Sequence, residues 1–179
     1  QHFGNPSSSH WAGRPAHDGI ENARSRIASL LRCNTDEIVL TSGGSEANNQ
    51  AVKGVVLGAT SPPHLIISAV EHPAVTEPCR MIERLGAEVT TIPVDGHGLI
   101  DPDDVRRAIR PETALISVMH ANNEVGTIQP IAAIARIARD HGILCHTDAA
   151  QSVGKIATQV DDLQVDLLSL TGHKFYAPK

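Results

Sequence analysis

Aromatic residues are scarce in this sequence, where Phe, Trp and Tyr make up 2% of the 179 residues. A core with so few large rings is filled by Val, Ile, Leu and Ala, as parallel sheets covered by alanine-rich helices commonly are. A chain of this length buries about 70% of the surface that its unfolded form exposes, which is enough for a conventional core. Composition therefore favours one domain of the α/β class.

Cysteine is scarce as well, and the three that occur are Cys33, Cys79 and Cys145. Because their number is odd and no CxxC or Cys/His ligand spacing occurs, neither a disulfide framework nor a zinc site is predicted. We expect each to be a small apolar filler, Cys145 in a strand, Cys79 in a helix and Cys33 at a helix end. A metal hydrolase is disfavoured too, because the 10 histidines form no HxH or HExxH pair.

The sequence also lacks any cluster of Lys and Arg, and its formal net charge is -5. Nucleic acids and anionic membranes bind concentrated positive charge, so neither partner is expected. No run approaches the roughly 20 apolar residues that span a bilayer, and the amino end lacks the layout of a signal peptide. We expect a soluble protein of the reducing cytoplasm.

Short apolar runs alternate along the chain with segments of helical periodicity. Strands are predicted at residues 37–41, 64–69, 88–93, 114–119, 143–147 and 166–170. Helices are predicted at residues 14–32, 45–57, 73–85, 102–109 and 130–141, several of which begin near a proline. This βα repeat predicts a mostly parallel sheet flanked by helices, with ligand-binding loops at the carboxyl ends of its strands.

Residues 41–47 (TSGGSEA) follow the first predicted strand and open a helix. Small residues there allow backbone N–H groups and the Ser45 hydroxyl to converge on an anion at the positive end of the helix. We interpret the segment as a phosphate site, although its spacing matches neither the dinucleotide fingerprint nor the P-loop. A serine that merely caps the helix explains the same residues equally well.

Asp148 ends the strand predicted at residues 143–147. An aspartate at the end of a buried strand is costly unless a cation meets it, and a protonated pyridine nitrogen would serve. An aspartate that caps the next helix is at least as good an interpretation of this segment alone.

Two further strand ends carry polar side chains that suit a planar ring. His72, after the strand predicted at residues 64–69, can stack on a ring or move protons. The loop at residues 121–126 (ANNEVG) contains Asn123, whose amide can donate to a ring oxygen. Taken alone, a loop histidine usually does neither, and Asn-rich loops more often bond their own backbone.

Lys174 lies just beyond the last predicted strand. A lysine at the mouth of a parallel sheet can act as an amine nucleophile toward an aldehyde, although most lysines are solvated surface charges. Together, the strand ends offer partners for a phosphate, a ring face, a ring hydroxyl, a ring nitrogen and an aldehyde. Pyridoxal 5'-phosphate carries all five groups, so it is the predicted cofactor, and no metal is required.

Six segments of the chain together resemble the cysteine desulfurases and selenocysteine lyases. They are residues 4–8 (GNPSS), 41–46 (TSGGSE), 71–72 (EH), 119–126 (MHANNEVG), 146–151 (HTDAAQ) and 171–176 (TGHKFY). The resemblance covers nearly the whole chain and implies fold type I of the pyridoxal phosphate enzymes, with residues 1–179 as the cofactor-binding large domain of a homodimer. It also implies release of sulfur or selenium from L-cysteine or L-selenocysteine, which leaves alanine.

The resemblance assigns catalytic roles to three positions. It implies that Lys174 binds the cofactor covalently, that His72 stacks on its ring and that Asp148 meets the ring nitrogen. Gln151 and Asn123 would then bond the region of the ring hydroxyl.

The resemblance places the phosphate contacts at Gly44, Ser45, Thr171 and His173. Many members of the family carry threonine in place of Ser45 and serine in place of Thr171, and each exchange keeps a hydroxyl. Asn5 lies in a loop that approaches the substrate in the family, which implies a substrate contact.

The family's sulfur-accepting cysteine and carboxylate-binding arginine lie farther along its chains. We therefore expect this sequence to be cut at both ends, without the first strand and the small domain, and to have little or no desulfurase activity alone. A sulfur acceptor or scaffold protein is an expected partner. Three alternatives stay open: a selenocysteine lyase, another class-V aminotransferase-like activity, and an inactive fragment that serves as a dimerisation or scaffold module.

Overall fold

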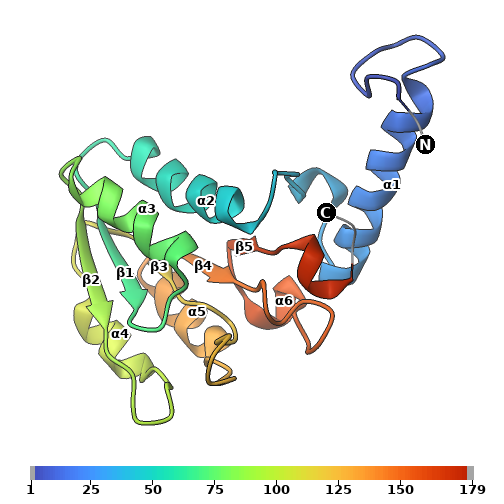
Figure 1. Ribbon diagram of the computed structural model, residues 1–179. Coiled ribbons are helices and arrows are strands. Elements are labelled where there is room, and N and C mark those ends of the chain that lie inside the picture. The colour runs from blue at the N-terminus through green and yellow to red at the C-terminus, as the bar shows by residue number, and fades with distance from the viewer. Residues whose placement is uncertain (1–2, 177–179) are drawn as a thin grey trace. The chain divides into compact units, whose positions relative to one another are not determined.

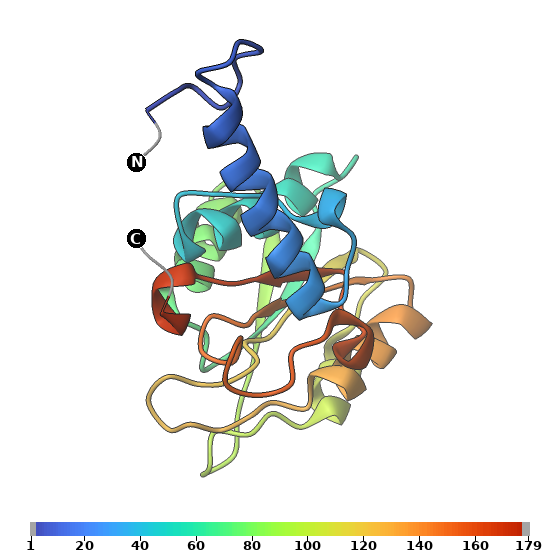
Figure 2. The ribbon, with the colours of Figure 1, turned by 90° about the vertical axis from the view of Figure 1, so that its right-hand side faces the viewer.

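The first part of the chain holds one long helix. The computed structural model describes residues 3–176, and the chain divides into two compact units that join between Leu40 and Thr41. In the first unit, α1 (Arg14–Leu31) carries a proline in its first turn and runs without a break, as predicted (Figure 2). It ends where Arg32 adopts the left-handed conformation, with φ 58°.

The strand predicted at residues 37–41 is wrong. A short 3-10 helix, η1 (Thr35–Glu37), forms where the strand was expected to begin, and residues 38–41 pair with no strand of the described chain. The Glu37 carboxylate accepts the Asn34 N–H at 2.6 Å, which completes a capping box and fixes this turn. Val39 is 64% exposed, so this apolar run has the composition of a buried strand without the burial.

The second unit is built on a five-stranded parallel sheet with the order β2-β1-β3-β4-β5. Its strands are β1 (His64–Ser68), β2 (Glu88–Ile92), β3 (Thr113–Ser117), β4 (Leu144–Asp148) and β5 (Leu167–Ser169). Five of the six predicted strands are thus confirmed to within a residue or two. The prediction of a mostly parallel sheet flanked by helices is confirmed as well.

The helices of the second unit fall largely where they were predicted. The four longer ones are α2 (Gly44–Gly58), α3 (Pro73–Glu83), α4 (Pro102–Ala108) and α5 (Ile131–Asp140). Two short helices, α6 (Val160–Leu163) and η2 (Gly172–Phe175), were not predicted. A single turn offers too few residues for a periodic pattern, so helices of this length carry no sequence signal.

Alternate strand residues build two hydrophobic cores, one on each face of the sheet. On β1, Leu65 and Ile67 pack with Val52 of α2 and Val75 of α3, whereas Ile66 packs into the other core. Figure 1 shows α2 and α3 on one face of the sheet and α4 and α5 on the other. Cover on both faces explains why a central strand such as β1 is buried along its whole length.

The strand order reverses direction beside β1. From β1 the chain adds β2 on one side, then crosses back to place β3, β4 and β5 on the other. In open α/β sheets, ligands bind in the crevice that such a reversal leaves at the carboxyl ends of the strands. We therefore expect a ligand-binding site at the loops that follow β1 and β3.

The cysteines behave as the sequence predicted. Cys145 is buried in β4 and Cys79 in α3, and Cys33 follows α1. Burial raises the pKa of the Cys79 and Cys145 thiols to about 12, so the nucleophilic thiolate is not populated near neutral pH. Across residues 3–176, no helix has both the length and the apolar character needed to cross a bilayer.

Candidate active site

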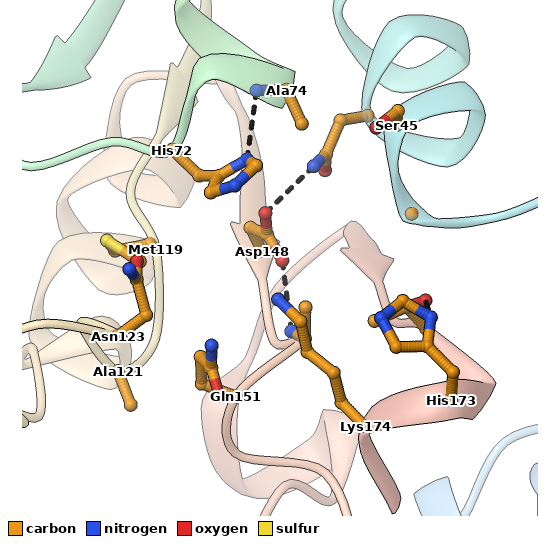
Figure 3. A pocket seen from close by; sticks show the side chains of 14 residues that line it. Ser45, His72, Ala74, Met119, Ala121, Asn123, Asp148, Gln151, His173 and Lys174 are labelled. Carbon is orange, nitrogen blue, oxygen red and sulfur yellow. Dashed lines mark hydrogen bonds between the residues drawn. The ribbon is translucent and has the colours of Figure 1, made fainter. Parts of the chain in front are cut away.

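A pocket of about 230 Å³ lies at the carboxyl edge of the sheet. It collects side chains from the start of α2 and from the segments that follow β1, β3, β4 and β5. Nine residues singled out from the sequence line it: Gly44, Ser45, His72, Asn123, Asp148, Gln151, Thr171, His173 and Lys174. Positions up to 130 residues apart, from 44 to 174, are therefore brought to one place (Figure 3).

Asp148 ends β4 and is 5% exposed. Its Oδ1 accepts the Ala150 N–H at 2.9 Å, and its Oδ2 accepts Nδ2 of Asn48 at 2.8 Å. Asp148 thus bonds the turn after its strand and also lines the pocket, and its contact with a ring nitrogen stays a prediction. Both donors are neutral, and Asp148 forms no ion pair with any residue from 3 to 176.

His72 immediately precedes α3 and caps it. The Ala74 N–H donates to Nδ1 at 3.0 Å, so the proton of the neutral ring resides on Nε2. The cap fixes the ring at the wall of the pocket, opposite the side from which Lys174 enters in Figure 3. Sequence reasoning proposed a ring stacker or proton carrier here and missed the capping bond.

The start of α2 lies against Thr171. A Cβ on Gly44 would approach the Thr171 Cβ to 3.3 Å, so glycine keeps this space open. The first N–H groups of a helix have no carbonyl partner within it, and those of Gly44 and Ser45 begin α2 beside the pocket. His173 completes this end, where its Nδ1 is hydrogen bonded to Thr171 Oγ1 at 3.0 Å.

Lys174 lies on η2, directly after β5, and its side chain reaches into the pocket (Figure 3). Gln151 lies across from it on the turn after β4, where its Oε1 accepts Lys155 Nζ at 3.4 Å. This bond occupies the amide oxygen of Gln151 and leaves the Nε2 hydrogens for other acceptors. An amine and an amide donor thus both line the pocket.

Two neighbouring asparagines in the loop after β3 have different surroundings. Asn122 serves the loop itself, because its Oδ1 accepts the Glu124 and Val125 N–H groups at 2.9 and 3.0 Å. Asn123 lines the pocket and makes no side-chain hydrogen bond with the rest of the described chain. The bonds of Asn122 confirm the interpretation that this loop bonds its own backbone, and donation from Asn123 to a ring oxygen stays a prediction.

Sequence reasoning missed three polar groups around the pocket. Asn48 lines it from α2, three residues after Ser45 and four before the buried Val52, a spacing that would have placed it on the inner face of the helix. Glu71 is buried and accepts the N–H of Met119, which lines the pocket, and His146 is buried between Ser117 and Ser169, to which it bonds at 2.8 and 3.0 Å. Their burial depends on tertiary contacts that no local pattern reveals.

Burial shifts the proton affinity of two of these groups in opposite senses. It raises the pKa of Glu71 to about 8 and lowers that of His146 to about 4, because a buried site disfavours the charged form of each. Both are therefore neutral near pH 7. No three or more His, Cys, Asp or Glu side chains within residues 3–176 are arranged to hold a metal ion.

Asn5 lies in the first unit, where its Oδ1 accepts the Ser7 N–H at 2.9 Å. Its contact with a substrate stays a prediction.

Comparison with known proteins places the chain in a family. The family described as aminotransferase class-V matches residues 1–179. The chain belongs to this family. Its members depend on pyridoxal phosphate, and the sheet is that of fold type I within these enzymes. The predicted resemblance is thereby confirmed at the level of family and fold.

Similar proteins include several cysteine desulfurases. Cysteine desulfurase IscS of Dictyoglomus turgidum is 54% identical over 178 residues, which cover 99% of this class-V chain and 45% of the relative. Two solved structures, SspA in complex with cysteine and DndA from Streptomyces lividans, match with TM-scores of 0.96 and 0.88 at 45% and 41% identity. They cover 99% of this chain in each case, and 52% and 50% of the respective neighbour. The chain thus spans about half the length of the proteins it matches.

Proposed function

We propose that this chain is the pyridoxal-phosphate-binding large domain of a cysteine desulfurase. The observation that carries the proposal is Asp148, a carboxylate that is 5% exposed and receives only neutral donors, in a pocket that also holds the Lys174 amine. A buried carboxylate without a cationic partner is costly, and the protonated ring nitrogen of this cofactor supplies the missing cation.

The end of the pocket at the start of α2 fits the phosphate. The space that a Cβ on Gly44 would fill lies between the start of α2 and Thr171, where the N–H groups of Gly44 and Ser45 begin a helix of 15 residues. A helix amino end of this kind favours an anion. The hydroxyls of Ser45 and Thr171 and the ring of His173 add hydrogen-bonding groups on the same wall.

The middle of the pocket fits the ring. His72 presents an imidazole whose orientation is fixed by the cap on α3, which suits stacking on a planar ring. Gln151 and Asn123 carry amide hydrogens that the rest of the described chain does not use, and we assign them to the region of the ring hydroxyl. Each proposed partner thus lies where the corresponding group of one compact molecule can meet it.

When bound, pyridoxal phosphate supplies an electron sink that stabilises negative charge at the Cα atom of an amino acid. In this proposal Lys174 Nζ would hold the cofactor covalently, and its amine, once free, would take the proton from Cα of the substrate. Oδ1 or Oδ2 of Asp148 would face the ring nitrogen and hold its proton. The substrate amino acid is L-cysteine, which the similarity to IscS and to SspA in complex with cysteine supports.

The proposal also concerns the assembly of the enzyme and the partner that accepts the sulfur. We propose that the enzyme works as a homodimer and passes sulfur to an acceptor or scaffold protein. Cys79 and Cys145 are buried thiols of raised pKa, so neither suits the role of sulfur carrier. Sulfur transfer is therefore assigned to a residue other than these two, and Asn5 is proposed to contact the substrate.

Reductive trapping tests the cofactor and its attachment site. The complete natural polypeptide that carries this sequence is mixed with pyridoxal phosphate and borohydride, digested and mapped by mass spectrometry. We expect the pyridoxyl label on Lys174 and none after Lys174→Ala. Lys53→Ala on α2 is the matched control, because Lys53 does not line the pocket and should leave labelling unchanged.

The same preparation tests the substrate. Alanine and sulfide released from L-cysteine, in the presence of a thiol reductant, would support the desulfurase. Faster release from L-selenocysteine, or amino transfer to a keto acid instead, would replace the desulfurase by a lyase or aminotransferase. Absence of any label would contradict the cofactor itself and favour a dimerisation or scaffold module.

A further inference from the structure

Asn48 is the most buried polar residue of α2, at 1% exposure. Its Nδ2 donates to Asp148 Oδ2 at 2.8 Å and joins α2 to the end of β4, 100 residues farther along the chain. A carboxylate only accepts hydrogen bonds, so this contact determines which way the Asn48 amide points. The nitrogen must face Asp148.

This residue works against the stability of the helix that carries it. Asparagine is a poor residue for a helix interior, because its amide competes for backbone hydrogen bonds. In addition, Oδ1 of Asn48 is buried and has no hydrogen-bond partner within residues 3–176. A half-satisfied amide in this position costs stability that an apolar side chain beside Val52 would not. Such a local conflict is expected where a residue serves function.

The bond from Asn48 differs in kind from the second bond to Asp148. Ala150 lies two residues after Asp148, so its N–H moves together with the turn and restrains the carboxylate only locally. Asn48 lies on the helix whose first residues, Gly44 and Ser45, line the anion-binding end of the pocket. Because α2 is a rigid element, the Asn48 bond holds the Asp148 carboxylate at a fixed position relative to that end of the pocket.

We propose that Asn48 is a positioning residue that fixes the orientation of the Asp148 carboxylate toward the ring nitrogen of the bound cofactor. The inference rests on the proposed function. It gives α2 two roles. The amino end of α2 binds the phosphate, and Asn48 holds the Asp148 carboxylate at the ring nitrogen, at the other end of the cofactor.

Paired asparagines on α2 provide the test. Asn48→Leu removes the donor and nearly preserves the shape of the side chain, and Asn48→Ala removes it with less bulk. Asn49→Leu and Asn49→Ala are the matched controls, because Asn49 is the same residue type on the same helix. Its Nδ2 donates at 2.8 Å to the Ser45 carbonyl and makes no bond to Asp148.

The measured quantities are the affinity for added pyridoxal phosphate and the pH midpoint at which the near-visible absorbance of the lysine-bound cofactor changes. Loss of the donor allows the Asp148 carboxylate to turn away from the ring nitrogen, and a less positive ring lets Nζ of Lys174, which forms the bond to the cofactor, keep its proton to higher pH. We expect the midpoint to rise by about one pH unit and binding to weaken about tenfold in the Asn48 variants. Thermal unfolding of the cofactor-free proteins reports folding separately.

A role in folding alone would lower the unfolding temperature of the Asn48 variants and leave the midpoint where it is in the wild type. An unchanged midpoint in a folded Asn48 variant, or an equal shift in the Asn49 variants, overturns the inference. If the wild type itself carries no lysine-bound pyridoxal phosphate, the proposed function fails. The wild-type spectrum therefore tests the function, and the variants test Asn48.

Discussion

Glu71 and Asp148 are both buried acids at the carboxyl edge of the sheet, yet their oxygens meet different partners. Asp148, at the end of β4, has a hydrogen-bond donor on each oxygen. Glu71, three residues beyond β1, accepts the Met119 N–H at 2.8 Å and the Ser68 hydroxyl, both on Oε1. Its Oε2 has no partner within the described chain.

The difference shows how a fold gives two buried carboxyl groups different surroundings. Asp148 lines the pocket, where its proposed partner is a cationic ring nitrogen. Glu71 is raised in pKa chiefly by burial, and the nearby charge of Asp148 adds to the effect. Glu71 is therefore neutral near pH 7, and different surroundings of neighbouring carboxyl groups are found where environment sets acid and base roles.

Removing the charge of Asp148 should have the largest effect. In the complete polypeptide, Asp148→Asn keeps the shape of the side chain but offers no anion to the ring nitrogen. We expect turnover of L-cysteine to fall by about 10²–10³-fold, the range seen when one preorganised electrostatic contact is lost. Steady-state alanine formation measures the loss, and circular dichroism confirms the fold. Turnover within about threefold of the wild type would show that catalysis does not need the negative charge of Asp148.

The pH dependence of stability should reveal the proton on Glu71. An unfolded carboxyl ionises near 4.5, whereas the pKa of folded Glu71 is about 8. Between these values the folded protein holds a proton that the unfolded chain has lost. Its free energy of unfolding therefore falls as pH rises, by at most about 1.4 kcal/mol per pH unit.

Urea unfolding at a series of pH values measures this slope, with Glu71→Gln as the reference that cannot ionise. His146 contributes a slope of the opposite sign between about 4 and 6.5, because burial lowers its pKa. The difference between wild type and Glu71→Gln removes that contribution, since both retain His146. Parallel curves for the two proteins above pH 6.5 would show that Glu71 is already ionised.

Ser68→Ala should have a smaller effect on the same acid. The Ser68 hydroxyl donates to Glu71 Oε1, and this bond lowers the pKa of Glu71 against the larger effect of burial. Its removal should shift the midpoint of the Glu71 contribution to higher pH and cost about 1 kcal/mol of stability. The same urea series measures both changes. A midpoint displaced to lower pH would be inconsistent with this bond.

Glu71→Gln should have the smallest effect on turnover. A glutamine oxygen can still accept the Met119 N–H and the Ser68 hydroxyl, and its amide replaces the protonated Oε2 without a change of charge. We expect turnover within about threefold of the wild type near pH 7. A loss as large as that of Asp148→Asn would show that Glu71 carries the essential charge, and the comparison would then be reversed.

The sequence predicts much of this fold because its signals are local. Short apolar runs such as that of β1 alternate with proline-initiated helices such as α3, and both patterns survive in the structure. The same kind of local pattern gives a wrong prediction at residues 37–41, where the Asn34 capping box stabilises a 3-10 turn and no strand forms.

The pocket was predictable in part for the same reason. Asp148 and His72 stand out because they follow strand ends, where parallel sheets gather ligand-binding loops. The raised pKa of Glu71 and the contact of Asn48 with Asp148 depend on burial between elements far apart in sequence. No spacing along the chain encodes the depth at which a side chain comes to lie.

The pocket wall is drawn from five separate segments, from the start of α2 to η2. Any occupant that contacts all of them can be released only when they separate, so its binding free energy opposes local opening of each. Amide hydrogen exchange in these segments should then slow in concert on saturation, although each loop lies between a different pair of elements. Ligand supply would in this way govern how long the whole edge of the sheet resists proteolysis.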